Sequence, residues 1–351
     1  MTGVLLINLG TPEAPTTQAV RTYLREFLSD PCVIDIHPMA RWLLLNAIIL
    51  PFRPKKSAAA YQKIWTPEGS PLRIHSEALT EAVQIHLGEE YNVRLAMRYG
   101  QPTIADELNN LMSAGATQIV VVPLYPQYAT SSTGTALNSV YKAATGRAVV
   151  PVLNVVPDYY DHPQFLDTVA SMIKADKAEF KPDHVLFSYH GLPERHIRQC
   201  DFSGTHCLVS DDCCDTIQEA NRSCYRAQCY ATTKGVVERL QLSTTEWTVG
   251  FQSRLGRTPW IKPYTDEILP ELVERGVRRL LVSCPSFVSD CLETLEEIGI
   301  RAREDFIAEG GEDLHLVPAV NSHENWVGAV ASMVRAYIND QGHPASSAIS
   351  D

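Results

Sequence analysis

Short apolar runs that alternate with amphipathic helical segments organise the chain. In residues 1–156 the apolar runs at 3–8, 92–97, 117–128 and 149–156 predict strands. One helix is expected at 17–27, and another follows the segment at 98–102 and ends near residue 113. Residues 157–320 repeat the order, with strands expected at 185–190, 247–252, 277–287 and 314–317 and a helix at 265–274. Almost wholly apolar runs are typical of parallel strands covered on both faces. The alternation therefore predicts βαβ units and an α/β fold.

Two segments show that the halves resemble each other. VLLINLGTPE at 4–13 and VLFSYHGLPE at 185–194 align in register, with Leu9 in the position of His190. We therefore expect an N-terminal half at 1–156, a C-terminal half at 157–320 and a C-terminal helix and tail at 321–351. Ligands of open α/β sheets bind beyond the carboxyl ends of the strands. The chemistry is thus expected at His190, in the second half.

Composition narrows the class of protein. The chain has 351 residues, of which 45% are hydrophobic and 20% charged, and a net charge of −11. This acidic balance argues against a nucleic-acid partner. The N-terminus has no signal-peptide pattern and no run reaches ~18 apolar residues, so we expect a cytoplasmic protein.

Residues 39–52 are apolar on nearly every face and are followed by the basic stretch RPKK. This pattern suits either a core helix or a peripheral contact with an anionic membrane surface.

His190 is the first candidate for chemistry. A histidine at a strand end is more often structural, but the Leu9 counterpart indicates that the fold does not require a histidine there. Gly191 would let a ligand approach closely. A neutral imidazole at this position could accept a proton or bind a metal.

A predicted helix at 290–298 carries the second candidates. Glu293 and Glu297 are four residues apart and share a helical face. A solvated face with Ser289 or Asp290 as cap is the structural alternative. The functional interpretation is a row of carboxylates along the helix that could pass a hard divalent cation or protons into the cleft.

The segment SRLGRTPW at 253–260 is a weaker signal. Arg254, Arg257 and Trp260 combine two cations with a large aromatic side chain at another strand end. Such a group would suit a flat, anionic, aromatic ligand.

Nine cysteines without an export pattern are not expected to form disulfides. Six of them fall within thirty residues, which favours metal binding: Cys200, Cys207, Cys213, Cys214, Cys224 and Cys229. Their spacing matches neither the C-x2-C pairs of zinc ribbons nor plant-type ferredoxins. From spacing alone, a [2Fe–2S] cluster and a tetrahedral zinc are equally expected.

Taken together, these motifs resemble the ferrochelatase family over nearly the whole chain. The matching segments are NLGTPE at 8–13, RYGQP at 98–102, YPQY to STG at 125–134, FSYHGLP at 187–193, FQSRLGRTPW at 251–260 and SDCLETLEEI at 289–298. The resemblance implies two Rossmann-like domains with parallel four-stranded sheets facing a central cleft. It implies insertion of ferrous iron into protoporphyrin IX, which gives protohaem and releases two protons, by a monomer or homodimer.

The resemblance also implies roles for individual residues. His190, Glu293 and Glu297 correspond to catalytic positions, with His190 and Glu293 as ligands of the substrate Fe2+. Residues 39–52 correspond to a lip over the pocket that touches the bilayer in membrane-associated members at the inner membrane. The porphyrin is expected to contact Leu9, Arg98, Tyr99, Tyr125, Gln252, Ser253 and Trp260.

For the cysteines, the resemblance to bacterial members with an internal cluster favours [2Fe–2S] over zinc. It points to Cys200, Cys207, Cys213 and Cys214 as ligands, with Cys224 in reserve because adjacent cysteines on one cluster are geometrically awkward. Cys229 occurs in a context shared with cluster-free members and is not expected to bind. The remaining cysteines are expected to be ordinary apolar residues: Cys32, Cys284 and Cys291.

Other functions keep the same fold. A chelatase could act on coproporphyrin or insert another divalent metal such as cobalt, and a porphyrin carrier would bind without catalysis. A single histidine facing a glutamate-rich helix favours iron over cobalt. A structural iron–sulfur sensor is the third alternative, and the complete set of pocket motifs argues against it.

Overall fold

A computed structural model of the chain describes residues 1–145, 148–254, 256 and 258–339. Its strands form two four-stranded parallel sheets with the same order, β2–β1–β3–β4 and β6–β5–β7–β8. The shared order confirms the predicted α/β class and the repetition between the halves. The strands are β1 (Thr2–Gly10), β2 (Tyr91–Tyr99), β3 (Gln118–Pro123), β4 (Val152–Val155), β5 (His184–His190), β6 (Trp247–Gln252), β7 (Arg279–Ser283) and β8 (Asp313–Leu316).

Two strand boundaries differ from the prediction. β3 ends at Pro123 instead of continuing to 128, because Pro123 and Pro126 lack the N–H that a central strand needs for its ladder. β4 covers Val152–Val155, a shorter span than the predicted 149–156.

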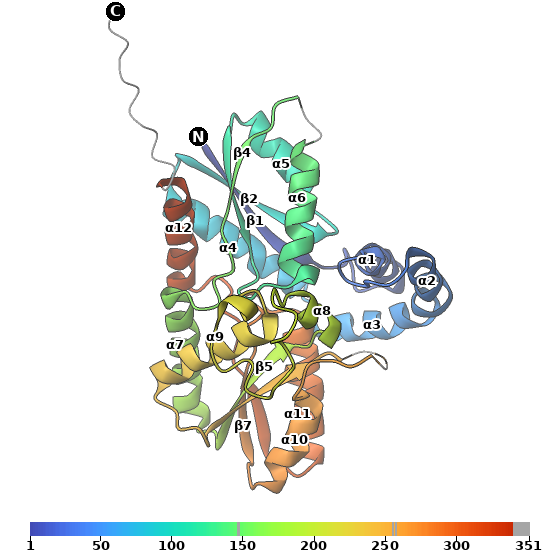
Figure 1. Cartoon of the computed structure of the whole chain (residues 1–351), viewed down its shortest axis with the longest axis vertical. Coiled ribbons are helices and arrows are strands. Elements are labelled where there is room, and N and C mark those ends of the chain that lie inside the picture. Colours follow the sequence, from blue (N-terminus) through green and yellow to red (C-terminus); the bar gives the residue numbers. More distant parts are fainter. Residues whose placement is uncertain (146–147, 255, 257, 340–351) are drawn as a thin grey trace, which may run out of the picture.

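Helices connect the parallel strands and cover the sheets (Figure 1). α5 illustrates why they form: Thr103 Oγ1 accepts from Asp106 N, and Ile104, Leu108 and Leu111 recur on one buried face. The covering helices are α4 (Pro71–Leu87), α5 (Ile104–Ser113), α6 (Thr135–Thr145), α7 (Pro163–Phe180), α9 (Tyr225–Leu240), α10 (Thr265–Glu274), α11 (Arg303–Ala308) and α12 (Glu324–Asn339).

The predicted C-terminal helix is α12, and it packs back on the first half. It contacts α4, β3 and β4 as well as α7 of the second half. Trp326 of α12 is fully buried against Tyr159 and Phe165. One apolar core consequently runs through both halves, from Val4 of β1 to Val185 of β5.

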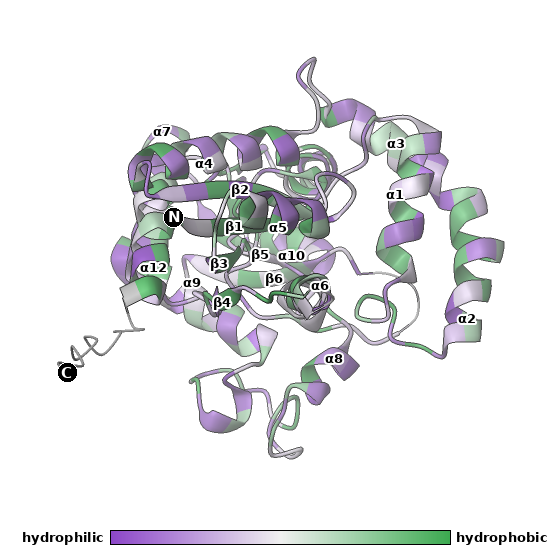
Figure 2. Cartoon of the chain, turned by 90° about the horizontal axis from the view of Figure 1, so that it is seen from above, coloured by the Kyte–Doolittle hydropathy of each residue, from purple (hydrophilic) through white to green (hydrophobic). Residues whose placement is uncertain are grey.

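Residues 17–64 form an arm beside the first sheet (Figure 1). The arm comprises α1 (Thr17–Ser29), α2 (Pro38–Leu43), the π-helix η1 (Leu44–Ile49) and α3 (Leu50–Ile64). Its own apolar core includes Leu24, Leu45 and Tyr61. Figure 2 shows the arm standing apart from the sheets, with hydrophobic positions along α2. Five large apolar side chains of the arm are 57–76% exposed: Met39, Trp42, Leu43, Ile48 and Phe52.

Within the described residues, no helix is long and apolar enough to cross a membrane. Met39, Trp42 and Leu43 of α2 and Ile48 of η1 are exposed apolar side chains on the surface of the arm. Residues 39–52 are thus helical and only partly buried, which rules out the ordinary core helix among the predictions.

The cysteine-rich segment lies between β5 and β6. It begins with α8 (Glu194–Gln199), contains the 3-10 turn η3 (Glu219–Asn221) and leads into α9. Asn221 is fully buried and its Nδ2 donates to Cys213 O and Thr216 O, both at 2.9 Å. Asp201 accepts from the backbone N–H of Cys207 at 2.7 Å. These bonds give the loop a defined path without regular structure.

Candidate active site

His190 is the last residue of β5 and lies at the carboxyl end of the second sheet. It pairs with Gln252 of β6, and its N–H donates to Ser286 Oγ at 3.4 Å. The next residue must be glycine, because a Cβ on Gly191 would lie 2.7 Å from Gln252 O. The ring of Phe287 lies 6.3 Å from the imidazole, between centroids. His190 is therefore held by its backbone and by one aromatic neighbour.

The hydrogen bond of its ring decides which nitrogen of His190 is available. Nδ1 lies 2.6 Å from Gly191 O. Because a carbonyl oxygen can only accept, Nδ1 carries the proton in this bond. The neutral ring then presents the lone pair of Nε2, which can accept a proton or bind a metal.

The acidic helix is a π-helix, η4 (Glu293–Ala302), and its hydrogen bonds differ from those of the α-helix implied by the prediction. π-turns of this kind occur frequently at functional sites. Asp290 does not cap it: the Asp290 carboxylate accepts from Thr294 Oγ1 at 3.0 Å and from Asn321 Nδ2 at 2.8 Å. The helix start is fixed instead by Gln252 Nε2, which donates to Glu293 O at 2.8 Å.

Glu297 is the acid most closely tied to His190. Burial raises the pKa of Glu297 and the nearby Glu293 charge adds to this, whereas Ser253, His190 and Arg301 oppose it. The Glu297 side chain is 18% exposed and lies 3.9 Å from Arg301 Nη2. His190 pairs with Gln252, whose Nε2 donates to Glu293 O, and the next residue, Ser253, binds the Glu297 carboxylate. The end of β6 therefore links the three predicted residues.

Arg53 of the arm faces the same acids and was missed as a site residue. The residue keeps solvent-exposed surface, yet desolvation of its guanidinium lowers the pKa of Arg53, and the charges of Glu293, Glu297 and Tyr61 oppose the shift. Burial likewise raises the pKa of Tyr61, with Glu293 as the next cause. The sequence signal for Arg53, the RPKK stretch after the apolar run, pointed to a membrane instead.

Predicted site residues of the first half gather around a buried carboxylate, Asp30. Arg98 pairs with Asp30 and donates to Thr135 Oγ1 at 2.7 Å, and Tyr99 Oη donates to Asp30 at 2.9 Å. Tyr99 is 1% exposed. Tyr125 Oη is buried, with no hydrogen-bond partner among the described residues. Arg98 and Tyr99 thus have a structural partner that the sequence did not reveal.

The remaining predicted contacts fall in different surroundings. Trp260 lies beside Gly191, where its ring would be 3.4 Å from an added Cβ, and pairs with Pro193 through an isolated bridge. Leu9 packs against the core of the arm. Arg254 pairs with Asp266 and Glu267 at 2.7 and 3.0 Å on the exposed surface, so it is not the free cation that the motif suggested. Arg257 lies outside the described residues.

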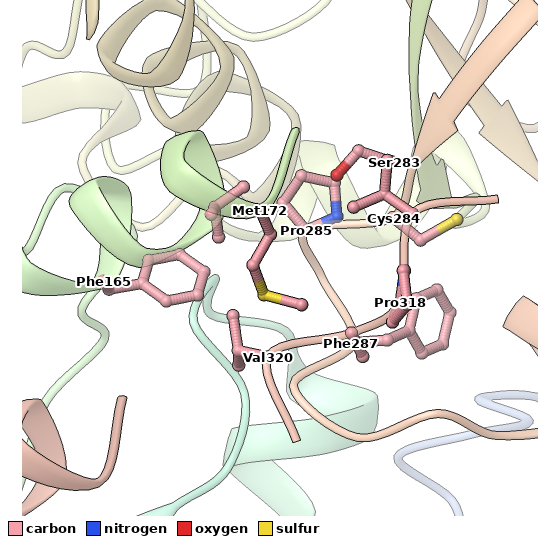
Figure 3. A pocket seen from close by; sticks show the side chains of 11 residues that line it. Phe165, Met172, Ser283, Cys284, Pro285, Phe287, Pro318 and Val320 are labelled. Carbon is pink, nitrogen blue, oxygen red and sulfur yellow. The ribbon is translucent and has the colours of Figure 1, made fainter. Parts of the chain in front are cut away.

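A small cavity lies behind Phe287 (Figure 3). Its volume is about 10 Å³, and α7 and the segments after β7 and β8 line it, with Phe165, Met172, Cys284 and Val320. This space holds about one water molecule. It is far too small for a porphyrin, so it belongs to the packing behind the site.

A short ion-pair network ties α8 to the arm. Asp35 pairs with Arg195, whose Nε lies 2.6 Å from Oδ1, and with His196 Nε2 at 3.2 Å. Burial raises the pKa of Asp35, but the bonds from Arg195 and His196 outweigh it and lower the pKa to about 2. We call this ion-pair network of Asp35, Arg195 and His196 the clasp. Because α8 begins four residues after His190 and Asp35 precedes α2, the clasp joins the two halves beside the site.

Four buried cysteines come together in the insertion. Cys213 Sγ and Cys214 Sγ are 3.7 Å apart, and the Cys224 thiol interacts with those of Cys214 and Cys207. Arg226 Nη1 donates to Cys214 Sγ at 3.1 Å. The hydrogen bond with Cys207 and burial raise the pKa of the Cys224 thiol to about 12, and the hydrogen bond with Cys214 opposes this increase.

Cys200 does not belong to this group, contrary to the prediction. It ends α8 and its thiol interacts with the Thr130 hydroxyl of the first half. The reserve residue Cys224 takes its place, because the start of α9 turns back towards the adjacent pair Cys213 and Cys214.

The donor set can be tested for its fit to a metal group. In the part of the chain that the structure describes, no three His, Cys, Asp or Glu side chains already surround a metal-sized space. The four buried thiols are linked in series, from Cys207 through Cys224 and Cys214 to Cys213, and Arg226 lies beside them. Thiolates are suitable ligands for a cluster or for tetrahedral zinc, so the donor chemistry fits such a group although these side chains do not enclose a metal position.

Comparisons with known proteins agree over the whole chain. A family model described as Ferrochelatase matches residues 1–338. The chain is 48% identical over 333 residues to a ferrochelatase of Coxiella burnetii (strain CbuG_Q212), covering 95% of this chain and 93% of the relative. It is 47% identical over 337 residues to a ferrochelatase of Legionella pneumophila (strain Paris), covering 96% and 99%. The solved structure of SirB from Bacillus subtilis with Fe3+ matches with a TM-score of 0.53 at 14% identity, covering 97% and 96%, which shows the fold alone.

Proposed function

The chain belongs to the ferrochelatase family, and we propose that it inserts ferrous iron into protoporphyrin IX as a lyase, forming protohaem and releasing two protons. The observation that carries this proposal is that the end of β6 links His190, through its pairing with Gln252, to Glu293 and Glu297 of η4. Metal insertion must remove two pyrrole protons and bind a hydrated cation, and a histidine near two carboxylates suits both tasks.

In this proposal, the histidine and the two glutamates have different chemical roles. His190 accepts a pyrrole proton through Nε2, because Nδ1 is committed to Gly191 O. Glu293 and Glu297 replace water oxygens around Fe2+ as it approaches, since carboxylates are suitable ligands for a hydrated divalent cation. Gln252 supports this role by holding the start of the acidic helix through Glu293 O.

The test is metalation by the purified protein under anaerobic conditions. Ferrous iron is mixed with protoporphyrin IX or with coproporphyrin, and haem formation is followed by its visible spectrum. We expect turnover with protoporphyrin IX at the higher kcat/KM and its loss in Glu293→Gln. A higher kcat/KM for coproporphyrin would reassign the substrate, and no haem from either would contradict the proposal.

We also propose that Cys207, Cys213, Cys214 and Cys224 hold a [2Fe–2S] cluster. Such a group supplies one-electron redox chemistry when bound. Arg226 supports the assignment because its guanidinium donates to Cys214 Sγ and would offset the negative charge of thiolate ligands. A brown protein with two irons per chain is expected. A colourless protein with one zinc would point to the tetrahedral alternative.

Finally, we propose that the arm contacts the cytoplasmic face of the inner membrane as a peripheral surface. The exposed apolar side chains of α2 and η1 are followed by Lys55 and Lys56, a combination that suits an anionic lipid surface. This patch lies on the same arm that supplies Arg53 beside the acids.

A further inference from the structure

Ser253 holds the carboxylate of Glu297 with two hydrogen bonds. Its backbone N–H donates to Oε1 at 2.9 Å and its Oγ donates to Oε2 at 2.6 Å. Both oxygens of one carboxylate are thus bound by a single residue. A serine expected to contact the porphyrin instead has both of its donors directed to an acid of the site.

The backbone of Ser253 is arranged for this contact. Its φ of 67° lies in the left-handed region, which few residues other than glycine adopt. Such conformations persist where the surroundings enforce them and cluster at functional sites. Here the strain accompanies two hydrogen bonds to a buried charge.

The left-handed turn has a further geometric effect. Successive side chains of an extended strand point to opposite faces. At the end of β6, however, Gln252 and Ser253 both reach η4: Gln252 binds Glu293 O and Ser253 binds the Glu297 carboxylate. The turn at Ser253 allows two consecutive residues to hold successive turns of the acidic helix.

Arg301 offers Glu297 a competing position. Its Nη2 lies 3.9 Å from Glu297 Oε1 and 3.5 Å from Glu296 Oε2, and its side chain is 54% exposed. An unrestrained Glu297 would be drawn outwards to this cation. The two bonds from Ser253 hold the carboxylate against the end of β6, the strand that pairs with His190.

We propose that Ser253 is a positioning residue for ferrous-iron capture, which fixes the Glu297 carboxylate towards His190 and away from Arg301. The inference rests on the proposed function, because Glu297 acts there as a ligand of the incoming metal. It assigns Ser253 to the metal side of the site and not to porphyrin recognition.

Two variants test this role. Ser253→Ala removes the Oγ donor, and Ser253→Gly removes the same donor while relieving the left-handed backbone, so it should fold. Initial rates of metalation are measured against ferrous iron at saturating porphyrin and against porphyrin at saturating iron. A hydrogen bond to a charged group is worth about 10- to 100-fold, so we expect both variants to lose kcat/KM for iron by about that factor, with KM for porphyrin unchanged.

A double variant and a control sharpen the test. If Arg301 competes for Glu297, adding Arg301→Gln to Ser253→Ala should restore part of the lost kcat/KM for iron. Gln241→Gly relieves another left-handed residue, with φ 55° at the exposed end of α9, and should leave both kinetic constants unchanged.

The outcomes separate this inference from the proposed function. A raised KM for porphyrin with iron kinetics intact would show that Ser253 serves the porphyrin, and it would overturn the inference. Wild-type kinetics in both folded variants would do the same. Absence of haem formation by the wild-type protein would instead overturn the proposed function.

Discussion

Replacing Asp35 by asparagine should loosen the junction between the arm and α8. The carboxylate of Asp35 binds Arg195 and His196, which follow it by 160 and 161 positions and belong to the other half. Asparagine keeps the shape and one acceptor oxygen but removes the charge. The change therefore isolates the ionic part of the clasp.

The expected magnitude follows from the pKa of Asp35. Its decrease from 3.8 to about 2 corresponds to roughly 2.4 kcal/mol at 1.36 kcal/mol per pKa unit. The side chains of Asp35 and Arg195 are 19% and 37% exposed, so solvent screening reduces this to about 1 kcal/mol. Because the pKa is depressed, the contribution is fully present above about pH 4 and is lost as the pH falls towards 2.

Thermal unfolding at several pH values provides the assay. At about 2.1 cal/mol/K per residue over 351 residues, about 1 kcal/mol corresponds to roughly 1–2 °C, so Asp35→Asn should lower the unfolding midpoint by that amount, equally at pH 7 and pH 5 and less below pH 4. Glu77→Gln is a matched control, since its pair with Arg73 lies within one helix on the exposed face of α4 and is worth at most about 0.5 kcal/mol. Equal midpoints of Asp35→Asn and wild type at pH 7 would refute the reasoning.

Three further predictions concern the acid, the cysteines and the arm. Burial raises the pKa of Glu297, so kcat/KM for iron should fall as the pH decreases through a value above that of an ordinary glutamate, and a pH profile of Glu297→Gln without this acidic limb would confirm the assignment. Cys224→Ser should abolish the visible absorbance of the cluster whereas Cys200→Ser should retain it, and the reverse pattern would restore the original choice of ligands. Trp42→Glu should weaken sedimentation with anionic vesicles several-fold, while Ile85→Glu, an exposed apolar site outside the arm, should not; equal binding by both variants would contradict the membrane surface.

The sequence predicted much of the fold because its signals were local. Apolar runs marked the strands, and the register between 4–13 and 185–194 anticipated two sheets of the same order. The π-form of η4 was not predictable in this way. It depends on contacts from distant segments, such as Gln252 with Glu293 O and Asn321 with Asp290.

Some site residues could be predicted from local sequence signals, whereas the positions of others depend on contacts between distant segments. His190, Glu293 and Glu297 could be proposed as neighbours because their residue types stand out at a strand end and on one helix, and their roles remain a prediction. Arg53 could not, because its proximity to the acids depends on the packing of α3 of the arm against η4. For the cysteines, spacing alone did not reveal that Cys200 turns towards Thr130 while Cys224 approaches Cys214.

Metalation by His190→Ala tests the central claim most directly. Purified wild-type and variant proteins are mixed anaerobically with saturating ferrous iron and protoporphyrin IX, and the rate of haem formation is recorded. General base catalysis is worth about 10²- to 10⁴-fold, so the variant should be slower by at least about 100-fold while still binding the porphyrin. A variant that forms haem at the wild-type rate would contradict the assignment of this chemistry to His190.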